Sequence, residues 1–192
     1  MLAPSICHAC QLGRHTHLPS RVSSSRASNK FDLIHCDPWT SSVASVSGYK
    51  YYLVILDDCS HYLWTFPLRL KSDTYDTLAN FFSYVTTQFG ATVKAVQCYN
   101  GHKFDNSNAR TFFLTRGTHL RMSCPYTLPQ NILNLLFQAS LPPSYWVEAL
   151  STATYLLNLL PTKTLGMTTP HMALYGSPPP MTISASSVAG AT

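Results

Sequence analysis

The sequence predicts an α/β domain in which a mixed five-stranded sheet is flanked by helices. Short apolar and aromatic segments of strand length crowd residues 31–68. A longer segment then repeats its apolar residues three and four positions apart, which is typical of an amphipathic helix. Beyond it strand and helix patterns alternate, and this order implies parallel strands joined by right-handed crossovers. With 192 residues, 45% of them hydrophobic, the chain is long enough for one packed core.

The expected elements follow one another in a definite order. The expected strands are residues 31–36, which Pro38 ends, 49–56, 62–68, 92–98 and 119–124, which Pro125 ends. The first helix begins after Ser72 and ends at Gly90, because serine caps helix N-termini and glycine ends helices. Further helices are expected at 106–116, in a short piece at 131–139, and from Trp146 to Leu160. The succession of strands and helices matches a ribonuclease-H-like topology.

Composition and domain organisation restrict the possible functions. Residues 1–26 are irregular, residues 27–176 form the domain, and the Pro/Ser/Ala-rich residues 177–192 are expected to be a disordered tail. The net charge is +5, but Lys and Arg are scattered, so nucleic acid is a compatible partner without being a required one. No apolar run is long enough to span a membrane. No secretory signal pattern precedes the six cysteines, so we expect an intracellular protein with reduced thiols.

Two strand ends are candidates for a metal site. Asp37 follows an apolar strand directly, although taken alone such an Asp forms a turn more often than it binds a metal. Tyr99 ends another strand just before an Asn-Gly turn, where the surrounding residues favour an aspartate. Two acids side by side there would hold a divalent cation. A phenol has a pKa near 10 and offers Mg²⁺ a neutral, weak oxygen, so the predicted metal site is broken.

Other motifs favour structural interpretations. Asp57 and Asp58 are adjacent in a strand and point to opposite faces, so we interpret them as turn-capping carboxylates. Cys7 and Cys10 form half of a zinc site, and a second pair at normal spacing is missing. Glu148 is the only glutamate of the chain, and we interpret it as a solvated or capping residue of the last helix.

Several segments, taken in their order along the chain, resemble one family. They are Cys7-His8-Ala9-Cys10-Gln11-Leu12-Gly13, Leu33-Ile34-His35-Cys36-Asp37, Gly48-Tyr49-Lys50-Tyr51-Tyr52-Leu53, Asp57-Asp58-Cys59-Ser60-His61-Tyr62-Leu63-Trp64, Asn100-Gly101, Cys124-Pro125-Tyr126-Thr127, Pro129-Gln130-Asn131, Tyr145-Trp146-Val147-Glu148-Ala149 and Tyr155-Leu156-Leu157-Asn158. Over residues 7–176 the chain resembles the integrase core of copia-type long-terminal-repeat retrotransposons. No single segment is decisive, but their joint order is highly specific.

The resemblance implies a polynucleotidyl transferase in which an Asp, Asp, Glu triad binds two Mg²⁺ ions. Asp37 stands at the first position, and Tyr99 stands at the second, 99 − 37 = 62 residues later. The Glu is expected on a helix after the Pro-Gln-Asn stretch. After the Pro-Gln-Asn stretch, the part of the family's sequence that would carry the Glu looks deleted. We therefore expect one helix of the fold to be truncated. Asp37, as the sole survivor of the triad, would bind Mg²⁺ weakly, because the ion prefers about six oxygen ligands.

The resemblance also assigns further residues and partners. Asn100 and Lys103 would contact nucleic acid, and Cys7 and Cys10 would be the incomplete zinc half-site of a pre-integrase module whose remnant is residues 1–26. The ancestral partner is DNA, both retrotransposon ends and target, and no membrane is involved. The family implies the nucleus, although the chain carries no clear nuclear targeting run. The sequence leaves oligomerisation open.

We therefore expect a retrotransposon integrase-core-like protein whose ancestor integrated DNA and which is itself a catalytically inactive pseudoenzyme. Two alternatives stay open. The chain could be a non-catalytic nucleic-acid-binding or interaction module, or it could be a poorly folded pseudogene product.

Overall fold

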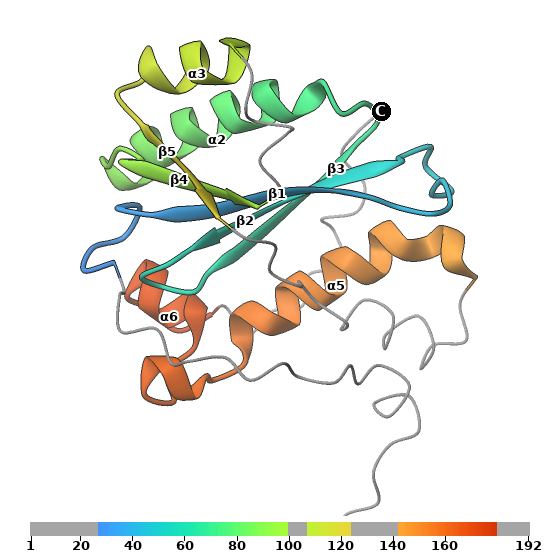
Figure 1. The fold of residues 1–192 in the computed structure, drawn as a ribbon. Helices are drawn as coiled ribbons and strands as arrows, with labels where there is room; N and C mark the ends of the chain where they lie inside the picture. Colours follow the sequence, from blue (N-terminus) through green and yellow to red (C-terminus); the bar gives the residue numbers. More distant parts are fainter. Residues whose placement is uncertain (1–26, 100–106, 124–141, 180–192) are drawn as a thin grey trace, which may run out of the picture.

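The structure is a computed structural model that describes residues 27–99, 107–123 and 142–179 (Figure 1). Some sequence predictions lie outside these residues and stay predictions. They are the Cys7 and Cys10 half-site, the roles of Asn100 and Lys103, the helix at 131–139 with its truncation, and the tail beyond 179.

Five strands form one sheet in the order β3-β2-β1-β4-β5. They are β1 (Ile34–Thr40), β2 (Tyr51–Asp57), β3 (Leu63–Leu68), β4 (Ala95–Tyr99) and β5 (His119–Ser123). β2 pairs antiparallel with both β1 and β3, whereas the β1–β4 and β4–β5 pairs are parallel. The predicted mixed sheet is confirmed: the first three strands form an antiparallel meander, and crossovers through helices lead to β4 and β5.

The prediction for the first strand is wrong at both ends. Phe31 precedes β1 and has a φ of 65°, so it is a buried turn residue and not a strand residue. β1 continues through Pro38 to Thr40 instead of ending before the proline. Proline lacks the N–H of a strand ladder and is tolerated where a strand has no neighbour. Because β4 ends at Tyr99, no described strand pairs with β1 at Pro38 on that side.

Helices cover both faces of the sheet (Figure 1). On one face lie α2 (Asp73–Phe89) and α3 (Ser107–Leu114), and on the other lies α5 (Trp146–Leu159) with α6 (Pro170–Tyr175) beside it. Two short 3-10 turns, η2 (Pro143–Tyr145) and η3 (Lys163–Leu165), flank α5.

The helix α2 begins after Ser72 and ends before Gly90 as predicted, but Ser72 does not cap it through its side chain. Gly90 takes the left-handed conformation, with a φ of 59°, and its N–H donates to the Thr86 carbonyl. Ser72 already has helical backbone angles, and its side chain makes no capping hydrogen bond. The carboxylate of Asp73 accepts from the Leu70 N–H at 3.0 Å instead, so the turn before α2 is held by the acid and not by the serine.

Two apolar cores follow from this layering. The larger core joins the sheet to α2, for example through Cys36, Ile55 and Val85, which are completely buried. The smaller core lies where Trp146 of α5 packs against Tyr52 of β2.

Asn158 of α5 attaches this helix to an edge strand of the sheet. Its Oδ1 accepts from the Leu63 N–H and its Nδ2 donates to the Leu63 carbonyl, both at 2.8 Å. The side chain is 4% exposed. The amide thus occupies the place of a neighbouring strand and satisfies backbone groups that the edge strand β3 would leave open.

Candidate functional site

Asp37 and Tyr99 occupy neighbouring positions in two adjacent parallel strands. Tyr99 ends β4 as expected, whereas the expected strand-end position of Asp37 is wrong, because it is the fourth of the seven residues of β1. The register of β1 and β4 pairs Cys36 with Cys98, so the next residue of each strand stands beside the other. In open α/β sheets, functional groups gather at the carboxyl ends of parallel strands. The backbone therefore provides the side-by-side arrangement that two metal-binding acids would need, with a tyrosine at one of the two positions.

Asp37 lies on the α5 side of the sheet, because Cys36 faces the α2 core and side chains alternate along a strand. Its side chain is largely buried, with 8% of the residue exposed. Burial and the negative charge of Asp37 together raise the pKa of Tyr52 to about 12. The ring of Tyr52 packs on Trp146, with 5.5 Å between centroids. Asp37 thus lies near aromatic groups and is largely shielded from water. In such surroundings its charge acts strongly on its neighbours.

Two thiols lie one residue before these positions. Cys36 and Cys98 are completely buried. A hydrogen bond with the Cys98 thiol, together with burial, raises the pKa of Cys36 well above its usual value. The reactive form of cysteine is the thiolate, so Cys36 is not an activated nucleophile in the folded protein.

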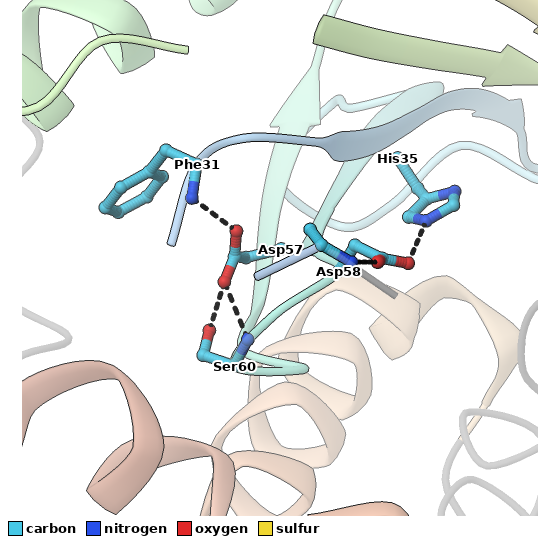
Figure 2. A network of polar contacts seen from close by, with 6 residues as sticks. Phe31, His35, Asp57, Asp58 and Ser60 are labelled. Carbon is cyan, nitrogen blue, oxygen red and sulfur yellow. Dashed lines mark hydrogen bonds and ion pairs between the residues drawn. The ribbon is translucent and has the colours of Figure 1, made fainter. Parts of the chain in front are cut away.

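Asp57 is a structural residue and not a catalytic one (Figure 2). Its carboxylate is completely buried and accepts hydrogen bonds from the Phe31 N–H at 2.8 Å, the Ser60 N–H at 2.8 Å and the Ser60 hydroxyl at 2.6 Å. These bonds close the turn after β2 and fix the positive-φ turn at Phe31. The turn-capping interpretation is confirmed for Asp57.

Asp58 joins the turn after β2 to β1 (Figure 2). Its carboxylate accepts from the Ala27 N–H at 2.6 Å and contacts the His35 Nε2 at 2.9 Å. Burial acts to raise the pKa of Asp58, but the bond from Ala27 and the contact with His35 outweigh it and hold the pKa below its usual value. The pair therefore anchors the start of the described domain. The expected structural role is confirmed for Asp58, but its carboxylate contacts Ala27 and His35 and not its own turn, so the turn-capping interpretation is wrong for this residue.

A group of cations and aromatic rings lies beside the carboxyl end of β1, with Tyr51 packed on the α2-side core and Tyr49 on the α5-side core. It consists of Tyr49, Lys50, Tyr51, Arg69 and Lys71, and we call it the basic–aromatic cluster. The guanidinium of Arg69 lies 5.2 Å from the ring centroid of Tyr49, and the ammonium of Lys71 lies 5.4 Å from that of Tyr51. Strand pairing places Thr40, at the carboxyl end of β1, opposite Tyr51. These contacts orient cationic side chains beside the carboxyl end of β1.

A groove of about 450 Å³ lies on the α2 side of the sheet, away from Asp37. Its lining includes Thr86, Thr118 and Arg116. Both threonine hydroxyls donate to backbone carbonyls at 3.0 Å, and the Arg116 guanidinium stacks 3.9 Å from the ring centroid of Phe112. Among the described residues that line the groove there is neither an acid nor a thiol.

Comparisons with known proteins identify a set of related sequences. No protein-family model matches the chain. The retrovirus-related Pol polyproteins from transposons RE2 and RE1 of Arabidopsis thaliana are 31% and 28% identical to it over 186 residues. The corresponding polyprotein from transposon TNT 1-94 of Nicotiana tabacum is 26% identical over 181 residues. These matches cover 90%, 90% and 86% of this chain but 13%, 13% and 14% of the relatives, so the chain spans a small part of their length.

A solved structure shares the fold. It is the simian T-cell lymphotropic virus intasome in complex with the PP2A regulatory subunit B56 gamma, which matches with a TM-score of 0.59 and 17% identity over 93% of this chain and 66% of its own. The predicted ribonuclease-H-like fold is confirmed. The chain is similar to a segment of these retrovirus-related Pol polyproteins.

The described residues do not fit the divalent cation that the resemblance to integrase cores implies. Among the described residues, no group of three or more His, Cys, Asp or Glu side chains could hold a metal ion. Position 99 carries a phenol in place of a carboxylate. Residues 106–147 contain neither Asp nor Glu, so the segment in which the third acid is expected supplies no carboxylate. Glu148 is exposed in the first turn of α5, as expected for a solvated residue.

Two groups of residues that the fold brings together are missing from the sequence predictions. One is the His35–Asp58 pair, whose signal is the histidine two positions before Asp37 on the same face of the strand. The other is the basic–aromatic cluster, whose signal is a Tyr-Lys-Tyr run at the start of β2 and an Arg-Leu-Lys run after β3. Neighbouring antiparallel strands bring such runs together.

Among the helices that the structure describes, none combines the length and the hydropathy needed to cross a bilayer.

Proposed function

We propose that this chain is an integrase-core protein that has kept the fold of its relatives and does not transfer DNA strands. The observation that carries the proposal is the register of β1 and β4, which puts position 99 beside Asp37. In a metal-dependent transferase, acids at these two positions would share a cation. Here one of them is a tyrosine, so a cation would find one carboxylate where it needs several oxygen ligands.

The remaining described acids support this proposal, because they are engaged elsewhere or exposed. Asp57 holds a turn, Asp58 contacts His35, Asp73 accepts from the backbone before α2, Asp32 pairs with Lys94, and Asp76 and Glu148 are exposed on their helices. None of them could approach Asp37 without breaking its own contacts or moving its helix. Asp105 is the one acid of the chain outside the described residues.

A strand-transfer assay tests this proposal. Duplex oligonucleotides that carry retrotransposon ends are incubated with the protein and Mg²⁺ or Mn²⁺, beside an active retrotransposon integrase as the positive control. We expect no joined product above the metal-free blank. The Tyr99→Asp variant should also be inactive, because the third acid is still missing. Metal-dependent joining that disappears in an Asp37→Asn variant would overturn the proposal, and joining that disappears in Asp105→Asn would show that this acid completes a site.

The basic–aromatic cluster favours a second function, the binding of nucleic acid without chemistry. Its cations Lys50, Arg69 and Lys71 take no part in the two ion pairs found among the described residues. Their charge is therefore available to phosphates, and ring faces beside cations suit stacked bases. The cluster borders the carboxyl end of β1. DNA is the partner that the relatives favour, and the net charge of +5 is compatible with it.

A filter-binding titration across a salt series tests the second function. Three phosphate contacts predict a slope of log K against log salt of about −2 to −3. Arg69→Ala and Lys71→Ala should each reduce the magnitude of the slope by about 1. The control is Lys163→Ala, which removes an exposed charge from η3, after the far end of α5, and should leave the slope unchanged. Binding that is absent near physiological salt, or that responds equally to all three substitutions, would exclude a role for the cluster.

A further inference from the structure

The buried thiols of Cys36 and Cys98 are arranged for a covalent bond. They occupy directly paired positions of the parallel strands β1 and β4, and both side chains lie in the α2-side core with no exposed surface. Neighbouring strands lie about 4.8 Å apart, which falls within the range of about 4.4–6.8 Å that separates the Cα atoms of a disulfide. Paired positions of parallel strands share one face, so both side chains point into the same space.

We propose that Cys36 and Cys98 form a redox pair. Its reversible disulfide links β1 to β4 one residue before positions 37 and 99. The proposal rests on the strand register and the burial of the two thiols. It does not depend on the function proposed above, since a disulfide here is possible whether or not the protein binds DNA or a metal.

The oxidant is a low-molecular-weight disulfide such as oxidised glutathione. The thiolate of Cys98 attacks one glutathione sulfur, forms a mixed disulfide and releases one reduced glutathione. The thiolate of Cys36 then attacks the Cys98 sulfur, forms the intramolecular bond and releases the second glutathione. The protein loses two electrons and two protons, and the glutathione disulfide gains them. Excess reduced glutathione reverses both steps.

Two structural features indicate that the bond is labile and that Cys98 reacts first. The strand spacing of about 4.8 Å exceeds the usual Cβ separation of about 3.8 Å in disulfides, so the strands must approach, and strained disulfides are easily reduced. Both thiols are shielded while the sheet is closed. Cys98 is the second-last residue of the five-residue strand β4, so local opening of this strand end exposes it before Cys36.

The experiment uses a pair-only variant, C7S/C10S/C59S/C124S, equilibrated in buffers with a series of oxidised-to-reduced glutathione ratios. After acid quenching and alkylation, intact mass reports how many thiols remain. We expect both thiols to be lost together. At a given glutathione ratio, the disulfide-to-dithiol ratio should be about tenfold higher in native buffer than in concentrated urea, because a fold that favours the bond raises the effective thiol concentration. A ratio no higher in native buffer than in urea would overturn the proposal.

Single substitutions within this background identify the order of attack. Adding Cys36→Ser leaves Cys98 to form a glutathione adduct, whereas adding Cys98→Ser leaves Cys36 to react more slowly. Equal rates, or the reverse order, would contradict Cys98 as the first nucleophile.

The wild-type chain provides a test that needs no substitution. Trypsin releases residues 31–50 and 95–103 as peptides that contain one cysteine each. After oxidation these two peptides should appear as one disulfide-linked species. Linkage of either peptide to another cysteine in place of its partner would refute the pairing.

Discussion

The neighbouring strands β1 and β2 each carry a carboxylate, Asp37 in the middle of β1 and Asp57 at the end of β2, and the surroundings of the two acids differ. Asp57 at the end of β2 is completely buried and accepts three hydrogen bonds from Phe31 and Ser60. Asp37 in β1 stands beside position 99, where a tyrosine replaces the acid that a shared cation would need. The bonds of Asp57 hold backbone groups of the fold, and they do not depend on a metal. Under the function proposed above, this is how the fold outlasts the metal site.

The largest expected effect comes from removing the structural carboxylate. Asp57→Ala leaves two buried N–H groups and one hydroxyl without their acceptor, so it should lower the free energy of unfolding by about 3 kcal/mol or more. Asp37→Ala, the matched change in the neighbouring strand, should lower it by less than Asp57→Ala does, because the burial of the Asp37 charge beside Tyr52 offsets part of what the carboxylate contributes. Urea unfolding monitored by circular dichroism measures both.

The conservative variant Asp57→Asn separates charge from hydrogen bonding, because it keeps one acceptor oxygen and the volume of the side chain. It should lose less stability than Asp57→Ala. Equal losses of unfolding free energy for Asp37→Ala and Asp57→Ala would remove the contrast between the two acids.

A smaller effect is expected at the edge of the sheet. Asn158→Ala removes both hydrogen bonds to Leu63 and leaves buried backbone groups open, so we expect a loss of about 1–3 kcal/mol in the free energy of unfolding. Thr154→Val is the control one turn earlier in α5, since it removes a single hydroxyl contact, to Thr65, and keeps the shape of the side chain. A loss for Asn158→Ala no larger than that of the control would show that the amide does not hold α5.

The smallest effect concerns pH. The pKa of Asp58 is lowered in the folded protein, since the Ala27 N–H bond and the His35 contact outweigh burial. Its contribution to stability is therefore present above the unfolded value of about 3.9 and is lost as pH falls through the lower folded pKa. Asp58→Asn should flatten the acid side of the stability profile by less than about 1 kcal/mol, because the pair is partly exposed. An unchanged acid profile in denaturant titrations would contradict this role.

The order and pairing of the strands followed from the sequence because period and turn signals are local. The same locality explains the errors. Pro38 looks like the end of a strand, yet it is tolerated inside β1 because β4 stops at Tyr99. Ser72 looks like a cap, but the neighbouring Asp73 makes the bond to the backbone.

The candidate site could be predicted in part. The adjacency of Asp37 and Tyr99 follows once β1 and β4 are taken as parallel neighbours. The bond between Asn158 and Leu63 spans 95 residues, and no local pattern marks it. The pairing of Cys36 with Cys98 depends on strand register, which the apolar runs alone do not fix.

Isothermal titration with Mn²⁺ and Mg²⁺ tests the central claim most directly, since it asks whether Asp37 still belongs to a metal site. We expect no binding tighter than about 1 mM for either ion, and no difference between the wild-type protein and Asp37→Asn, because a single carboxylate supplies too few of the oxygen ligands that these ions need. Saturable binding of two ions at micromolar concentration, lost in Asp37→Asn, would contradict the account.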